Sequence, residues 1–375
     1  MKRLLIVVTS ARWGGAQKYV YDLCRGLSNS EFQIYIASGV NGPMTDALRD
    51  CGMEVMTVKM LTRNPGLRDD FFALVSLFQL IRAVRPDIVH LNSSKAAVLG
   101  VIAAKLFGIR KVIITSHGWP FLEPVSRIRQ WIYKSIVSVA VALADHTITV
   151  SRTDFDAART FPFLNPNRLH LIHNGVSRSD EWGDRMQIRE RFISTHAPNG
   201  RSNRFWIGVI GELNQNKGQE VIIDQFTRYA PSHTELFLLG DGVDYEKLAC
   251  QITRSSRKHD IHLVGHVSRA SAVMKAFDLI AVPSLKEGLP YVILEAGLAN
   301  VAVIAHNVGG IPDILTDMEN GVLVDNENKS WRERLPMLIE NESLRTRLAA
   351  NLKHTVETRF QKRSMIKEVE RLYLS

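Results

Sequence analysis

Cysteine is scarce in this sequence, and its placement argues against some kinds of site. Cys24, Cys51 and Cys250 are odd in number and far apart, without the paired spacing of zinc ligands. This pattern is typical of reduced thiols in the cytosol. No cluster of histidine and cysteine occurs either. Asp154 and Asp156 are expected at the start of a helix, where positions i and i+2 diverge, so we interpret them as solvated charges. The sequence predicts a cytoplasmic protein without a metal site.

Long hydrophobic runs are also missing. The longest, residues 136–144, contains a serine and is well short of the roughly 18 residues that a membrane span needs. Residues 1–8, MKRLLIVV, imitate a secretory signal, but their apolar part is shorter than the usual ~7–15 residues. We therefore expect no transmembrane helix, and we interpret residues 2–9 as the first strand.

Two further absences narrow the function. No Gly-x-Gly-x-x-Gly follows a predicted strand in the second half, which argues against a dinucleotide-dependent redox enzyme. The basic residues of the first half have no run of interleaved aromatic residues, so nucleic acid is not an expected partner.

Positive charge is unevenly distributed. Residues 1–175 hold 21 Lys and Arg against 12 Asp and Glu, whereas residues 176–375 hold 26 against 26. A basic first half can face an anionic membrane, phosphorylated acceptors or solvent alone, and these alternatives stay open. Its basic residues include Arg63, Arg68, Arg82, Arg85, Lys105, Arg110, Lys111, Arg127, Arg129 and Lys134.

Strand-like and helical segments alternate along the whole chain, which predicts an α/β fold with parallel, doubly wound sheets. The length suits two domains of roughly 150–200 residues each. We predict a Rossmann-like domain over 1–175, a polar linker over 176–204, a second Rossmann-like domain over 205–355 and a final helix over 356–375. The expected strands are 2–9, 33–37, 54–58, 88–92, 112–115, 146–150, a short one within 165–175, 206–210, 236–239, 261–264, 279–282, 301–305 and 322–324.

The helix expected over residues 124–144 has a pronounced apolar side, and two alternatives remain for it. Either this side packs on the sheet as in an ordinary crossover helix, or it lies on a membrane surface. Much earlier in the chain, residues 59–70 contain Pro65-Gly66 and are expected to be a mobile loop. The apolar side consists of Val125, Ile128, Trp131, Ile132, Ile136, Val139 and Leu143.

Residues 286–295, KEGLPYVILE, carry the strongest sign of a ligand site. They follow a buried strand, and Pro290 sets φ for the first turn of a helix whose free N–H groups favour an anion. Glu287 and Glu295 would repel phosphate, so they are better suited to accept hydrogen bonds from sugar hydroxyls beside it. A sugar attached to a phosphate is one interpretation, and an ordinary connection with two solvated glutamates is the other.

Residues 211–218, GELNQNKG, add a second anion site. Asn216 can cap the following helix, and Lys217 at its first position adds a full positive charge to the amides of that turn. A diphosphate is the natural ligand for this combination.

These motifs occur in an order that resembles the retaining nucleotide-sugar glycosyltransferases of the GT-B fold, family 4-like, of the bacterial capsule, exopolysaccharide and O-antigen type. The resemblance rests on the Glu-x-x-x-x-x-x-x-Glu spacing of Glu287 and Glu295 and covers nearly the whole chain. The other landmarks are Gly14-Gly15-Ala16-Gln17, His117-Gly118, Asn174-Gly175-Val176, residues 211–218, Gly240-Asp241-Gly242 and Val308-Gly309-Gly310-Ile311-Pro312.

The resemblance implies two Rossmann-like domains with an interdomain cleft and a C-terminal helix that crosses back to the first domain. It implies His117, Lys217 and Glu287 as catalytic residues. Donor-binding residues would be Gly15, Gly211, Glu212, Asn214, Lys217, Gly240, Val267, Glu287, Gly288, Leu289, Pro290, Tyr291 and Glu295. Acceptor residues would be Ser94, Lys95 and Trp119.

The implied reaction is retaining transfer of a sugar from a nucleotide-diphosphate sugar, a co-substrate, to a hydroxyl of a growing cell-surface glycan. No cofactor or metal is expected. Partners would be the nucleotide sugar and a glycan or polyprenyl-diphosphate-linked acceptor, with peripheral attachment to the anionic inner face of the plasma membrane. Glu212 departs from the arginine usual in this family. This departure leaves a non-catalytic sugar-nucleotide-binding subunit as an alternative, and a sugar-nucleotide epimerase of the same two-domain shape is another.

Overall fold

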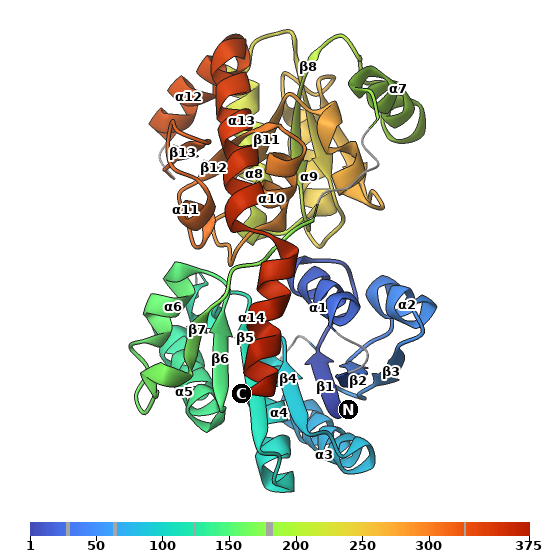
Figure 1. Ribbon diagram of the computed structural model, residues 1–375. Helices are drawn as coiled ribbons and strands as arrows, with labels where there is room; N and C mark the ends of the chain where they lie inside the picture. The colour runs from blue at the N-terminus through green and yellow to red at the C-terminus, as the bar shows by residue number, and fades with distance from the viewer. Residues whose placement is uncertain (28–30, 63–65, 124, 178–182, 326–327) are drawn as a thin grey trace. The chain divides into compact units, whose positions relative to one another are not determined.

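The computed structural model describes residues 1–27, 31–62, 66–123, 125–177, 183–325 and 328–375. Arg63 and residues 178–182 of the predicted linker lie outside the described residues. By its contacts the chain divides into two compact units (Figure 1). Unit 1 comprises Met1–Asn174 and Lys362–Ser375, and unit 2 comprises Gly175–Gln361.

Unit 1 is built on a parallel sheet, which over the described residues has seven strands in the order β3-β2-β1-β4-β5-β6-β7. The central strand β1 is almost fully buried, because both faces of the sheet are covered by helices. The strands are β1 (Lys2–Val8), β2 (Phe32–Ser38), β3 (Glu54–Thr57), β4 (Ile88–Leu91), β5 (Lys111–Ser116), β6 (His146–Thr149) and β7 (Leu169–Leu171).

Two groups of helices cover this sheet. Helices α3, α4 and α5 pack side by side, and they share a hydrophobic core with the strands. Helix α1 instead contacts α2 and the last helix, α14. The helices are α1 (Gly15–Gly26), α2 (Pro43–Asp50), α3 (Leu67–Val84), α4 (Ser94–Phe107), η1 (Pro120–Leu122), α5 (Arg127–Leu143), α6 (Arg152–Ala158), η2 (Pro166–Arg168) and α14 (Lys362–Leu374).

Unit 2 repeats the architecture with a parallel sheet of six strands over the described residues, ordered β10-β9-β8-β11-β12-β13. Its strands are β8 (Phe205–Ile210), β9 (Thr234–Leu239), β10 (Ile261–Gly265), β11 (Leu279–Val282), β12 (Ala302–His306) and β13 (Val322–Val324). Its helices are α7 (Arg185–His196), η3 (Gln215–Lys217), α8 (Gln219–Tyr229), α9 (Tyr245–Arg254), η4 (Ala270–Ala276), α10 (Tyr291–Leu298), α11 (Ile311–Ile314), α12 (Asn328–Glu340) and α13 (Glu342–Arg359).

The α/β class, the two Rossmann-like sheets and the positions of their strands are confirmed. The predicted linker, in contrast, contains helix α7, which packs within unit 2. Its Arg189 is buried, stacks over Trp206 with 4.6 Å to the ring centroid, and donates to Asp278 at 2.5 Å. The polar composition of residues 176–204 did not indicate this helix, because its buried contacts include those of a charged residue, Arg189.

The end of the chain consists of two helices where the sequence predicts one over 356–375. Helix α13 ends at Arg359 in unit 2, and α14 begins at Lys362 in unit 1. On α14, Tyr373 is fully buried, and its hydroxyl lies 2.5 Å from Nδ1 of His90. Nε2 of His90 lies 2.7 Å from the hydroxyl of Thr115, so this network ties α14 to β4 and β5.

Helix α5 corrects one expectation. Val137, Ala140 and Val141 form its buried face, whereas Ile128 and Trp131 are 74% and 71% exposed. Packing of the predicted apolar side on the sheet is therefore wrong. Small side chains occupy the inner face because α5 packs closely against α4.

Two smaller expectations also change. The end of the predicted loop over 59–70 is helical, because α3 begins at Leu67. Asp154, interpreted as a solvated charge, is 2% exposed, and its carboxylate accepts a hydrogen bond from the backbone N–H of Trp119 at 3.2 Å. This backbone donor supplies a hydrogen bond to one oxygen of a buried carboxylate at the start of α6.

Candidate functional site

Four loops meet at the carboxyl edge of the unit 2 sheet, where parallel sheets bind ligands. They follow β8, β9, β11 and β12 and pack backbone against backbone. Gly218 has φ +66°, and a Cβ there would lie 2.0 Å from the carbonyl oxygen of Pro283. Gly309 has φ +56°, and a Cβ there would lie 1.9 Å from the carbonyl oxygen of Glu287. Only glycine permits these approaches, so both positions fix the shape of the site.

Lys217 and Glu287 come together at the centre of these loops. The ammonium of Lys217 donates to a carboxylate oxygen of Glu287 at 2.7 Å, and the hydroxyl of Ser284 donates to the same oxygen at 2.6 Å. The side chain of Glu287 is 8% exposed and that of Lys217 is 32% exposed. The pair therefore combines a held carboxylate with a cation that still reaches solvent.

Ser284 is itself held by a buried chain of side chains that sequence reasoning missed. Trp331 donates its indole N–H to Nε2 of His306 at 2.9 Å. Nδ1 of His306 must then carry the proton and donate to the carbonyl oxygen of Ser284, 3.2 Å away. Burial lowers the pKa of His306, which favours this neutral form. The available signal was a histidine and an asparagine ending the otherwise apolar run VAVIAHN.

A small cavity lies directly beside this pair. Its volume is about 10 Å³, roughly the room of one water molecule. Lys217, Gln219, Ser284 and Glu287 are among the residues that line it. Six apolar residues complete the lining, so the polar atoms of the site face only part of a space that a ligand oxygen or a water can occupy.

The remaining predicted donor residues of unit 2 lie on the same edge. Gly211, Glu212 and Asn214 follow β8, and Gly240 follows β9. The side-chain oxygen of Asn214 is buried, and among the described residues it has no hydrogen-bond partner. Val267 follows β10 and its side chain is buried, so a contact with the donor would come from its main chain.

Gly288, Leu289 and Pro290 lead into α10, which begins at Tyr291 and carries Glu295 on its second turn. One detail of the sequence interpretation is wrong. Asn216 does not cap α8, because it lies inside the short helix η3, and Gly218 is the residue that precedes α8. Lys217 is accordingly the last residue of η3.

In unit 1, Gly15 is exposed at the start of α1, and His117 follows β5. The ring of His117 packs edge-on against Tyr19 at a centroid distance of 4.9 Å. Both of its ring nitrogens are buried, without a hydrogen-bond partner among the described residues. Burial lowers the pKa of His117 to about 3, so the ring is neutral at physiological pH. One nitrogen can then donate to a ligand and the other can accept.

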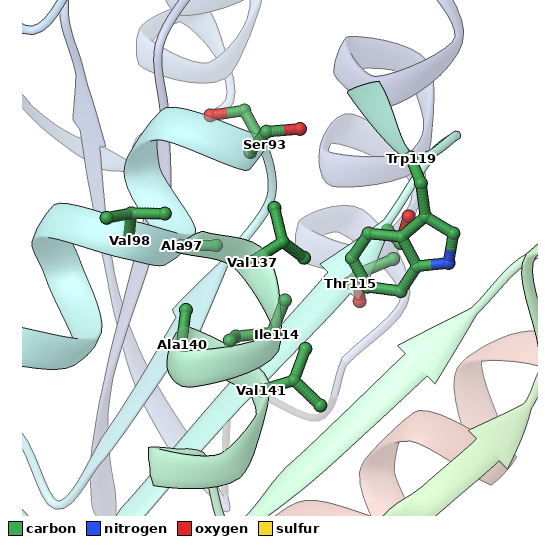
Figure 2. A pocket seen from close by; sticks show the side chains of 11 residues that line it. Ser93, Ala97, Val98, Ile114, Thr115, Trp119, Val137, Ala140 and Val141 are labelled. Atoms are coloured by element: carbon green, nitrogen blue, oxygen red, sulfur yellow. The ribbon is translucent and has the colours of Figure 1, made fainter. Parts of the chain in front are cut away.

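Two of the predicted acceptor residues line one small cavity of unit 1, which has a volume of about 10 Å³ (Figure 2). Ser94 is exposed at the start of α4, but Trp119 is 2% exposed and donates its indole N–H to the carbonyl oxygen of Asp154. Its burial argues against direct contact with an acceptor. Lys95 is outside this lining, and it forms an ion pair of 2.5 Å with Asp70.

Two family models match consecutive parts of the chain. "Glycosyltransferase Family 4" matches residues 13–180, and "Glycosyl transferases group 1" matches residues 193–355. HepE from Anabaena, solved in complex with UDP-glucose, superposes with a TM-score of 0.85 at 21% identity, over 100% of both chains. The chain belongs to the GT-B glycosyltransferases.

Relatives of this glycosyltransferase include proteins of bacterial glycan synthesis. A UDP-Gal:alpha-D-GlcNAc-diphosphoundecaprenol alpha-1,3-galactosyltransferase from Escherichia coli is 25% identical over 96% of this chain and 93% of its own. The capsular polysaccharide biosynthesis glycosyltransferase CapM from Staphylococcus aureus is 24% identical over 87% and 86%. WaaG, a glycosyltransferase of lipopolysaccharide biosynthesis, has a TM-score of 0.78 at 14% identity, over 98% of both chains.

Within the described ranges, no group of three or more His, Cys, Asp and Glu side chains is arranged to hold a metal ion. Of the helices that the structure describes, none has the length and apolar character to cross a membrane.

Proposed function

We propose that this glycosyltransferase transfers a sugar, with retention at the anomeric carbon, from a nucleotide-diphosphate sugar to a hydroxyl of a growing cell-surface glycan. The observation that carries this proposal is the pair Lys217 and Glu287, 2.7 Å apart where four loops meet. The relatives named for capsular polysaccharide and lipopolysaccharide biosynthesis support the glycan class.

In the proposed reaction, the bond between the anomeric carbon and the diphosphate breaks as the acceptor hydroxyl bonds to the same face of the sugar. The hydroxyl proton leaves with a diphosphate oxygen. Negative charge therefore grows on the leaving group, and a preorganised cation lowers the barrier most there. Lys217 would supply this cation. Its ammonium has three donors, so it can hold Glu287 and still face a phosphate.

Glu287 would orient the sugar. One of its oxygens is occupied by Lys217 and Ser284, which leaves the other to accept hydrogen bonds from donor hydroxyls. Glu295, on the second turn of α10, would contact the ribose. The contact of His117 with the donor sugar and that of Gly15 with the phosphate stay predictions.

We infer that the reaction needs neither a metal ion nor a cofactor, because Lys217 and the N-terminal amides of α8 and α10 supply positive charge in the proposed diphosphate site. Glu212 stands where the family usually has arginine, so Lys217 is the charged group on which the diphosphate depends.

The proposed acceptor is linked to a polyprenyl diphosphate at the inner face of the plasma membrane, in the cytoplasm. This proposal draws on the E. coli relative, whose name specifies a diphosphoundecaprenol acceptor. The basic excess of residues 1–175 suits a phosphorylated acceptor presented at an anionic surface.

A thermal-shift screen of UDP-, GDP- and ADP-sugars, followed by a transfer assay with the donor that binds, tests the function. A bound donor raises the melting temperature by mass action. We expect one nucleotide class to stabilise the enzyme and to be consumed only when acceptor is present. Conversion of the donor sugar without acceptor would favour an epimerase, and stabilisation without turnover would favour a non-catalytic binding subunit.

A further inference from the structure

Helix α5 carries a row of exposed apolar side chains, the apolar stripe. Apart from the adjacent Trp131 and Ile132, its members recur at steps of three or four residues, so they share one face of the helix over a length of about 22 Å. The stripe consists of Ile128, Trp131, Ile132, Ile136, Val139 and Leu143, all of them exposed.

The apolar stripe is not a remnant of core packing. The inner face of α5 is already complete, with Val137, Ala140 and Val141 buried. More than half of the large apolar side chains that are exposed in the described chain lie on the neighbouring helices α3, α4 and α5. The described part of unit 2, built on the same architecture, exposes Met186, Val243, Tyr245 and Met318. A concentration of this kind marks an interaction surface.

Positive charge accompanies the apolar stripe. Arg127, Arg129 and Lys134 lie on α5, which contains no acidic residue, and no ion pair in the described structure involves these three side chains. Basic residues in the first turn oppose the helix dipole, so the fold gains nothing from Arg127 and Arg129 there. A partner with negative charge would offset this cost.

We propose that the apolar stripe is the surface by which unit 1 lies on an anionic lipid bilayer. Helix α5 has 17 residues and is too short to span a membrane. Apolar residues beside basic ones suit a helix lying in the plane of the interface, where arginine and lysine reach the headgroups and tryptophan is favoured. A second copy of the chain would instead set one basic helix against another, so charge complementarity selects the lipid.

This placement is consistent with the position of the predicted acceptor residues. Val137, Ala140 and Val141 on the inner face of α5 line the same cavity as Ser94 (Figure 2). Helix α5 therefore separates a predicted acceptor residue from the proposed bilayer face. In this respect alone the inference rests on the proposed function, since a lipid-linked acceptor would arrive from that side.

Sedimentation with phosphatidylcholine vesicles, with and without phosphatidylglycerol, tests the surface. The wild-type chain should bind the anionic vesicles at low salt and be released at high salt. Ile128→Ser, Trp131→Ser and Val139→Ser combined should weaken binding on the order of a hundredfold, because the apolar contact is lost. The positions are exposed, so the fold should persist. Val243→Ser with Met318→Ser in unit 2 is the matched control and should bind like wild type.

Two further variants separate charge from insertion. Arg127→Gln, Arg129→Gln and Lys134→Gln combined should weaken binding by about fivefold per charge at low salt. Trp131→Phe should bind vesicles almost normally but lose the fluorescence quenching by brominated lipids that wild type shows.

Absence of wild-type binding, equal binding by the stripe variant, or quenching that survives in Trp131→Phe would overturn the proposal. Self-association that the stripe variant abolishes, without lipid binding, would assign the surface to a second copy instead. Donor stabilisation and transfer to a water-soluble acceptor are measured on the same proteins. If vesicle binding persists but transfer fails in wild type, the proposed function is wrong and this surface stands.

Discussion

Replacing Lys217 with methionine tests the central charge of the proposed site. Methionine keeps the apolar stem and removes the ammonium that lies 2.7 Å from Glu287. If this ammonium stabilises the departing diphosphate, its loss should lower kcat by about 10²–10³, since removing one preorganised donor has typically had this effect. Because the interaction strengthens in the transition state, kcat and kcat/KM should fall together.

The same replacement has a cost in stability that must be separated from catalysis. Breaking a buried ion pair costs about 3–5 kcal/mol, but Lys217 is 32% exposed, so we expect roughly 1–3 kcal/mol. Glu287→Gln added to Lys217→Met removes the unpaired carboxylate. The double variant should regain part of the melting temperature and none of the transfer rate.

The assay combines initial rates, measured below the melting temperature of every variant, with full thermal denaturation curves. Lys247→Met is the matched control, because Lys247 pairs with Glu220 on the surface of the same unit. It should retain wild-type kcat. A change in kcat below about threefold for Lys217→Met would show that its ammonium does not stabilise the departing diphosphate. Recovery of transfer in the double variant would show that Lys217 only neutralises the charge of Glu287.

Three other predictions concern different parts of the enzyme. His306→Phe should lower the free energy of unfolding by about 1–3 kcal/mol and kcat roughly tenfold, because the Ser284 carbonyl loses its donor. Denaturation and initial rates measure both effects, and an unchanged kcat would contradict the prediction. Burial lowers the pKa of His90 to about 3, whereas an unfolded histidine titrates near 6.5, so the unfolded state takes up the proton first as pH falls. Because of this group, the free energy of unfolding should fall by about 2 kcal/mol between pH 7 and pH 5. The melting temperature of His90→Gln should therefore fall less steeply than that of wild type over that range. Transfer should survive EDTA, and a complete loss restored by magnesium or manganese would disprove metal independence.

The sheets were predictable from the sequence for a simple physical reason. A strand covered by helices on both faces must be apolar along its length, and runs such as LLIVV before Thr9 and LIAV before Pro283 satisfy this condition. Most of these runs are followed within two residues by glycine, serine, asparagine or proline, which also located the loops of the site. That Lys217 and Glu287 lie near each other was also predictable, because the loops after parallel strands lie at the same carboxyl edge of the sheet.

The orientation of α5 was not predictable in the same way. Periodicity identified an apolar side, yet Ala140 and Val141 on the opposite side are also apolar, and these smaller residues are the ones that fit beneath α4. Which face of α5 turns inward depends on the space left by the neighbouring helices. The sequence of a single segment holds no information about that space.

Long-range polar contacts were equally out of reach. Ser284, His306 and Trp331 are separated by 22 and 25 positions, and their hydrogen bonds depend on three elements being in place. Asp154 was misjudged for the same reason, because its partner Trp119 lies 35 positions away. The polar end of the run VAVIAHN marked His306 as unusual, but no local pattern identified the partners in either contact.

The anomeric configuration of the product tests the central claim most directly. Once the donor screen has identified the nucleotide sugar, the purified enzyme is incubated with it and an acceptor, and the coupling constant of the new anomeric proton is measured by NMR. From a donor with the sugar α-linked to the diphosphate, retaining transfer should give an α-linked product and release the nucleoside diphosphate. A β-linked product would contradict it.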